Sequence, residues 1–192
     1  MDPSSQANSL IGIGRGALIS AMFGAGWLGW GLGNAKTFNG FVAPTFGFTA
    51  LFLFAYSIYF IRKGRLLRKE CLAAGAYTYP PALRWFLLVA LAEFLAIPFV
   101  VILANRLHRV DLATDWCALI VGLHFLPLAK IFRAPQFSVL GITMILWCIL
   151  SWALFQADMM AISTSVGTGI LLWGNSVTSL FRARRIAQST ST

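Results

Sequence analysis

The chain has 192 residues, of which 58% are hydrophobic and only 11% are charged, and its mean hydropathy is +0.77. A soluble domain carries about 25% charged residues, so this composition excludes an ordinary soluble protein and predicts that a lipid bilayer surrounds the chain. The net charge of +9 does not indicate a nucleic-acid partner, because membrane proteins use basic loops to fix their orientation.

Six apolar segments account for most of the chain, and each is near the roughly 20 residues that a helix needs to cross a bilayer. They are 9–32, 41–61, 85–104, 116–132, 137–155 and 160–181. We therefore expect an all-α membrane protein in which residues 1–192 form a single polytopic bundle of six transmembrane helices. A plasma or inner membrane is the expected location.

The basic residues predict the orientation of the bundle, because most of them fall in the loops of one side. They are Arg62, Lys63, Arg65, Arg68, Lys69, Arg84, Lys130, Arg133, Arg182, Arg184 and Arg185. By the positive-inside rule, both termini are then cytoplasmic. The stretch from Arg62 to Lys69 is expected to be a loop. Its basic residues should also attract anionic lipid headgroups, with a free energy of about 1 kcal/mol for each basic residue.

Three helices in each half, with the first starting inside and the fourth starting outside, permit a 3+3 inverted repeat of the kind found in transporters. Direct support in the sequence is slight. The triplet Ala-Leu-Ile occurs at 17–19 and again at 118–120, at comparable places in the first and fourth helices.

The first helix carries very small residues at helical spacing, which lets neighbouring backbones approach closely inside a membrane. The residues predicted to form this packing face are Gly12, Gly16, Ser20, Gly24 and Gly29. We expect the face to bind other helices of the bundle, a second copy of the chain or a partner membrane subunit.

Glu93 lies near the middle of the third span, where exposure of a charge to lipid would cost about 2.5 kcal/mol or more. Arg15 in the first helix is expected within about 6 Å of the same depth, at a rise of 1.5 Å per residue. Two interpretations stay open. Glu93 either forms an ion pair with Arg15 or lines a polar cavity, where it binds a cation or carries a proton.

His124 is the one histidine in a predicted span, and Pro127 follows it closely. A proline inside a helix frees a backbone carbonyl and bends the helix, and Pro98 should do the same beside Glu93. A helix bend beside an ionisable residue is typical of polar pathways in membranes. The plainer interpretation is that His124 donates one hydrogen bond across a helix interface.

The sixth segment carries a polar stripe of Thr164, Gly167, Thr168, Asn175 and Thr178. Such residues usually pack helices together, although Asn175 matches the expected depth of Arg15. In the outer link 105–115, Asp115 and its charged neighbours are expected to form a solvated rim.

No motif predicts a cofactor, a metal ion or a catalytic centre, and the three cysteines lack metal or redox spacing. The leading hypothesis is a small channel or transporter that moves a small solute or ion along a path lined by Glu93, His124, Arg15 and Asn175, with proton coupling as an option. The alternative is a structural or assembly subunit of a membrane complex or homo-oligomer. A membrane-embedded enzyme acting on lipid is the least favoured of the three, because no second catalytic group is identifiable.

Overall fold

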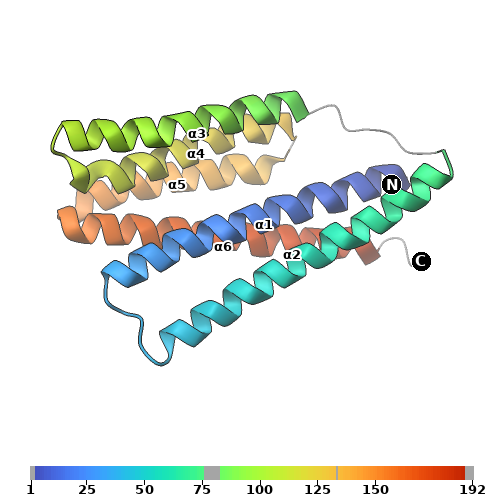
Figure 1. The fold of residues 1–192 in the computed structure, drawn as a ribbon, viewed down its shortest axis with the longest axis horizontal. Helices are drawn as coiled ribbons and strands as arrows, with labels where there is room; N and C mark the ends of the chain where they lie inside the picture. Colours follow the sequence, from blue (N-terminus) through green and yellow to red (C-terminus); the bar gives the residue numbers. More distant parts are fainter. Residues whose placement is uncertain (1–2, 76–82, 133, 189–192) are drawn as a thin grey trace. The chain divides into compact units, whose positions relative to one another are not determined.

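The computed structural model describes residues 3–75, 83–132 and 134–188. In these ranges the regular elements are all helical (Figure 1). The helices are α1 (Pro3–Asn34), α2 (Val42–Ala73), α3 (Leu83–Arg106), the short 3-10 helix η1 (Val110–Leu112), α4 (Ala113–Ile131), α5 (Pro135–Leu154) and α6 (Ala157–Gln188). The prediction of an all-α protein is confirmed for the described part of the chain.

Five of the described helices are long and apolar enough to cross a membrane, which is the composition of a multi-pass membrane protein. They are α1, α2, the segment Phe86–Arg106 of α3, α4 and α5. The sixth predicted span, 160–181, lies within α6, which has the length to cross but is more polar than the other five. Part of its polarity comes from buried side chains, namely Thr164, Ser165, Thr168, Asn175, Ser176 and Ser179.

Helix α2 extends well past the predicted span 41–61, so the stretch from Arg62 to Lys69 is helical and the expectation of a loop there is wrong. The residues after 61 are mostly arginine, lysine and leucine, which favour a helix whether lipid or water surrounds it. The length of the apolar segment therefore underestimates the length of the helix. The thickness of the bilayer core sets how many residues must be apolar, but the helical backbone can continue beyond it.

The chain divides into two compact units, and α1 and α6 contribute to both. Unit 1 comprises Met1–Ala25, Asn39–Pro80 and Leu172–Thr192, and unit 2 comprises Gly26–Phe38 and Pro81–Leu171. Unit 1 thus contains α2 with the first part of α1 and the second part of α6. Unit 2 contains α3, α4 and α5 with the remaining parts of α1 and α6. The single transmembrane domain expected over 1–192 stays a prediction.

In unit 1, α1 and α2 approach each other through a reciprocal pair of glycines. A methyl carbon added at Gly14 would lie 2.8 Å from the Ile61 side chain and 3.2 Å from the Ser57 carbonyl oxygen. One added at Gly64 would lie 3.0 Å from the backbone nitrogen of Ile11. Since van der Waals contact needs more room, the two backbones can lie this close only without side chains at both positions.

Helix α6 also lies close to α1 in unit 1, and its side chains hydrogen-bond to α1. Three side chains of α6 donate to α1: Trp173 Nε1 to the Ala21 carbonyl at 3.1 Å, Asn175 Nδ2 to Ser20 Oγ at 2.9 Å, and Ser176 Oγ to the Ala17 carbonyl at 2.9 Å. Bonds to the backbone of a neighbouring helix require small residues around the accepting carbonyl, and two of the three acceptors belong to alanines.

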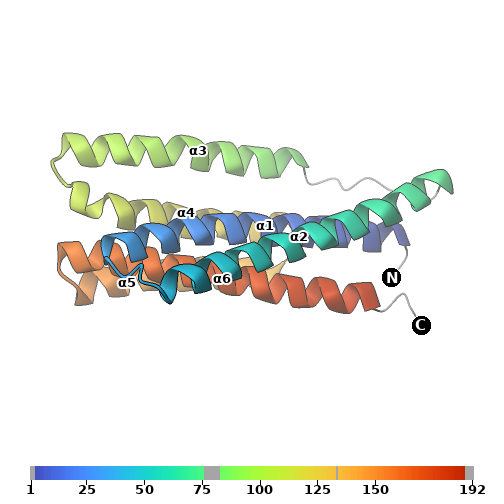
Figure 2. The ribbon, with the colours of Figure 1, turned by 60° about the horizontal axis from the view of Figure 1, so that its bottom comes forward.

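In unit 2, α4 and α5 also meet at glycines. A methyl carbon at Gly141 would lie 2.6 Å from the carbonyl oxygen of Gly122. Further along α5, the Trp147 indole lies across α6 against Gly167 and donates to the Ser163 carbonyl at 3.0 Å. These contacts hold α4, α5 and the first part of α6 together. Figure 2 shows α3 running alongside α4 in this unit.

The residues of the predicted packing face differ in their surroundings. Ser20 and Gly24 are buried, and Gly16 and Gly29 are partly buried. Gly12 is exposed, and a methyl carbon added there would meet no atom within 4 Å. A strict i+4 row turns by about 40° at each step around a helix of 3.6 residues per turn, so it does not follow one face. Gly14, where the close contact falls, lies about 200° around α1 from both Gly12 and Gly16, on the opposite side of the helix.

We predict that Gly14→Leu lowers the free energy of unfolding by about 1–3 kcal/mol, because the larger side chain must push α2 away. Gly12→Leu is the matched control on the same helix and should leave stability unchanged or slightly higher. Thermal unfolding of both variants in one detergent measures the difference. Equal losses in the two variants would refute the Gly14 contact.

Candidate functional site

A contact between two ionisable side chains of the spanning segments joins α3 to α4 in unit 2. His124 Nδ1 lies 3.3 Å from Glu93 Oε1, with the His124 and Glu93 side chains 16% and 18% exposed. The pair is within ion-pair distance. It is not aligned as a hydrogen bond, because the buried Nδ1 atom has no hydrogen-bond partner among the described residues.

The two helices that carry this pair are continuous. Pro98 and Pro127 lie inside α3 and α4, and both helices continue through them. The bends predicted at these prolines stay predictions. On α4 the His124 ring packs against the buried ring of Phe125, with centroids 4.3 Å apart, which fixes the imidazole on the side that meets Glu93.

A carboxyl group and an imidazole at this separation can hold one proton between them. Uptake or release of that proton changes the charge of the pair by one. Imidazole is also the side chain that most readily accepts and donates protons near neutral pH. The arrangement can therefore bind and release a proton or a small cation at membrane depth.

The other two residues predicted to line the path belong to unit 1. Arg15 is exposed on α1, whereas Asn175 is buried on α6 and donates its hydrogen bond to Ser20. A side chain satisfied by a neighbouring helix needs no substrate to explain its burial. The described partner of Glu93 is His124, and the ion pair with Arg15 stays a prediction.

Asp115 is buried, so the expectation that it lies in a solvated rim is wrong. It is only 5% exposed, and Thr164 Oγ1 of α6 donates a hydrogen bond to its Oδ1 atom. Asp115 lies in the first turn of α4, where the helix dipole favours a negative charge.

A signal for this burial exists in the sequence. The buried positions of α4 fall on one side of the helix, with pairs such as Asp115 and Ala118, Val121 and Phe125 three or four residues apart. They are Asp115, Cys117, Ala118, Val121, Gly122, Phe125, Leu128 and Ala129. Helical periodicity therefore assigns Asp115 to the buried face, although its position at the end of a span favoured water.

Further polar contacts join α5 to α6 in unit 2. The Ser151 and Ser163 hydroxyls lie 3.1 Å apart, and Thr168 is fully buried with its hydroxyl unpartnered among the described residues. Cys117 and Cys148 are buried free thiols. In the part of the chain that the structure describes, no group of three or more histidine, cysteine or acidic residues could hold a metal ion.

Comparison of the chain with protein-family models, with curated proteins and with solved structures gives no match. Its class therefore rests on its own helices and side chains. They define a helical protein whose composition is that of a multi-pass membrane protein, with an ionisable pair between two of the apolar helices.

Thr164→Val should lower the free energy of unfolding by about 1.5–3 kcal/mol, because it removes a hydrogen bond to a buried carboxylate without changing the shape of the side chain. Thr178→Val is the matched control, since that exposed hydroxyl bonds only within α6. Its effect should stay within about 0.5 kcal/mol. Equal stabilities of the two variants in thermal unfolding would contradict the contact with Asp115.

Proposed function

We propose that the protein is a small membrane transporter or channel in which Glu93 and His124 bind and release a proton or small cation as a solute or ion crosses the bilayer. The contact between these two side chains, from two apolar helices, is the observation that carries the proposal. Ionisable groups inside spanning segments are costly and rare, so a pair of them is best explained by a pathway that uses their charge.

The prolines add support. Pro98 lies five residues after Glu93 and Pro127 lies three residues after His124, and the carbonyl that each proline frees from its helix is next to Glu93 or His124 in the chain. A freed carbonyl is a further oxygen that a proton-bearing group or a cation can bind. The proposed path therefore begins with these oxygens and the two side chains, while Arg15 and Asn175 stay as proposed members from unit 1.

A structural or assembly subunit, alone or as a homo-oligomer, is the second candidate. It is supported by the bonds from α6 to α1, which explain Asn175 and Ser176 without any substrate. A lipid-active enzyme has less support, since Glu93 and His124 would have to supply the general base with no nucleophile identified beside them.

The proposal keeps the predicted arrangement in the membrane. Six helices cross a plasma or inner membrane, both termini are cytoplasmic, and the halves are related as an inverted repeat. The basic residues of α2 and α6 support the orientation. Burial of the hydroxyls of α6 supports a sixth span in spite of its polarity, because neighbouring helices rather than lipid then surround those groups.

Proton flux into proteoliposomes tests the function. With a potassium diffusion potential imposed by valinomycin and an internal pH-sensitive dye, we expect the purified protein to acidify the lumen faster than protein-free vesicles do. Glu93→Gln and His124→Gln should each remove most of this flux, because neither variant keeps a pair that can exchange a proton.

Glu70→Gln is the matched control, since Glu70 is an exposed carboxylate near the end of α2. It should retain the flux of the unmodified protein. Vesicles that contain the protein but acidify no faster than empty ones would contradict the proton-coupled form of the proposal, and so would full activity of Glu93→Gln.

A further inference from the structure

One face of α2 carries a continuous stripe of side chains that begins with aromatic rings and ends near basic residues. Its members follow one another at alternating spacings of four and three, which keeps them on one side of a helix. They are Phe52, Tyr56, Tyr59, Lys63, Leu66 and Glu70. Two shallow grooves of unit 1 follow this stripe.

The first groove is aromatic. It has a volume of about 270 Å³ and is lined by Phe52, Ala55, Tyr56 and Tyr59. The rings stack in a row, with centroids of Phe52 and Tyr56 5.7 Å apart and those of Tyr56 and Tyr59 6.0 Å apart. Phe52 and Tyr59 are 55% and 51% exposed, so a flat apolar surface is open to a neighbouring molecule.

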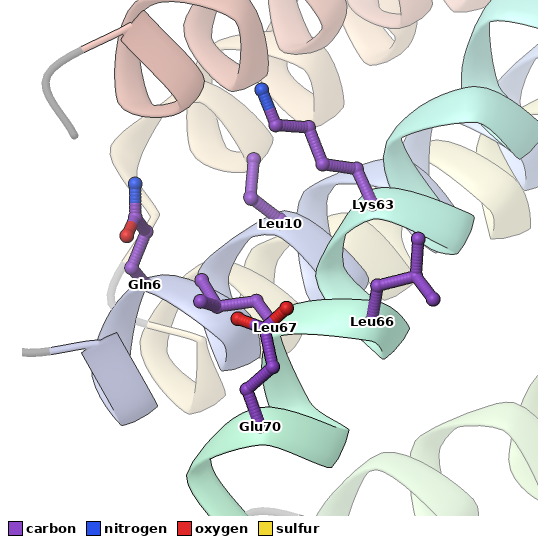
Figure 3. Close-up of a pocket in the computed structure, with 6 residues that line it drawn as sticks. All are labelled: Gln6, Leu10, Lys63, Leu66, Leu67 and Glu70. Carbon is purple, nitrogen blue, oxygen red and sulfur yellow. The ribbon is translucent and has the colours of Figure 1, made fainter. Parts of the chain in front are cut away.

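The second groove lies between the start of α1 and the end of α2 and has a volume of about 200 Å³ (Figure 3). Gln6 and Leu10 line it from α1, and the remaining lining residues come from α2. Gln6 Nε2 donates to the Ile186 carbonyl at 2.8 Å, and Lys63 Nζ to the Ala187 carbonyl at 3.5 Å. An ammonium group has three donors, so this one long bond leaves Lys63 able to bind an anion.

These bonds bring the end of α6 to the same end of unit 1, where basic residues gather. On α2 they are Arg62, Lys63, Arg65, Arg68 and Lys69, and on α6 they are Arg182, Arg184 and Arg185. Among the described residues of unit 1 the one acidic side chain is Glu70. The surface around the second groove is therefore strongly complementary to an anion.

The length of the stripe fits one leaflet of a bilayer. From Phe52 to Lys63 the helix rises about 16 Å at 1.5 Å per residue. Half of a hydrocarbon core about 30 Å thick is about 15 Å. An acyl chain along the aromatic groove thus reaches the middle of the bilayer when its headgroup lies at Lys63.

We propose that this stripe is a binding site for an anionic phospholipid. The phosphate lies between Arg62 and Lys63, and one acyl chain lies along Phe52, Tyr56 and Tyr59. Glu70 lies beyond the phosphate position and repels an anion that moves further toward the end of α2. A second copy of the chain fits less well, because two copies inserted in the same orientation and packed along α2 would bring their basic ends together. The site does not depend on transport.

The test compares phosphatidylglycerol with phosphatidylcholine of the same acyl chains, each titrated into the detergent-solubilised protein and counted by native mass spectrometry. Phosphatidylglycerol should bind more tightly. Arg62→Gln should weaken its binding about fivefold, the ratio that corresponds to about 1 kcal/mol for a basic residue near a lipid headgroup. Arg65→Gln is the matched control, since both arginines are exposed but Arg65 lies about 200° around α2 from Lys63.

Binding of phosphatidylglycerol should change less than twofold in Arg65→Gln. Equal affinity for the two lipids would overturn the proposal, and equal losses in both variants would reduce it to diffuse attraction by surface charge. Competition by water-soluble glycerol phosphate as effective as that by the whole lipid would replace the lipid site with a simple anion site. Lipid-independent dimers lost on Tyr59→Ala would assign the stripe to a second copy.

Discussion

Close contact between helix backbones at glycines is the constraint on which the described structure depends. In unit 1 the pair Gly14 and Gly64 sets the distance between α1 and α2, and in unit 2 Gly122 and Gly141 do the same for α4 and α5. Lipid supplies no hydrophobic drive between helices, so packing and interhelical hydrogen bonds must stabilise the fold. Small residues serve both purposes, because they increase contact area and expose backbone carbonyls to donors from a neighbouring helix.

This constraint separates the buried polar residues into two kinds. Asn175 and Ser176 of α6 are explained by the hydrogen bonds that they donate to α1, and the bond from Thr164 explains how a carboxylate as buried as Asp115 is kept. Glu93 and His124 are different, because they contact each other without an aligned hydrogen bond. A pair that is costly to bury and imperfectly bonded is weak evidence for a purely stabilising role, which is why we propose for it a role in moving charge.

Apolar length alone predicted the helical class and the approximate place of every described long helix, since the bilayer fixes how many apolar residues a span needs. It could not predict the extension of α2 past residue 61, because helix propensity rather than the thickness of the bilayer determines where that helix ends. The i+4 row does not include Gly14, because Gly14 lies on the opposite side of α1 from Gly12 and Gly16. Asp115 was misplaced because its charge was given more weight than its spacing. The partner of Glu93 could not be predicted, because the neighbours of a span depend on packing that no single helix encodes.

The central claim, that Glu93 and His124 form one ionisable unit, is tested most directly by a double-mutant cycle on thermal stability in one detergent. The variants are Glu93→Gln, His124→Gln and the double substitution. Contact predicts a coupling energy of about 0.5–3 kcal/mol, so the double variant should differ from the sum of the single ones. Additive effects for Glu93 and His124, together with coupling between Glu93→Gln and Arg15→Gln, would contradict the account and restore the ion pair with Arg15.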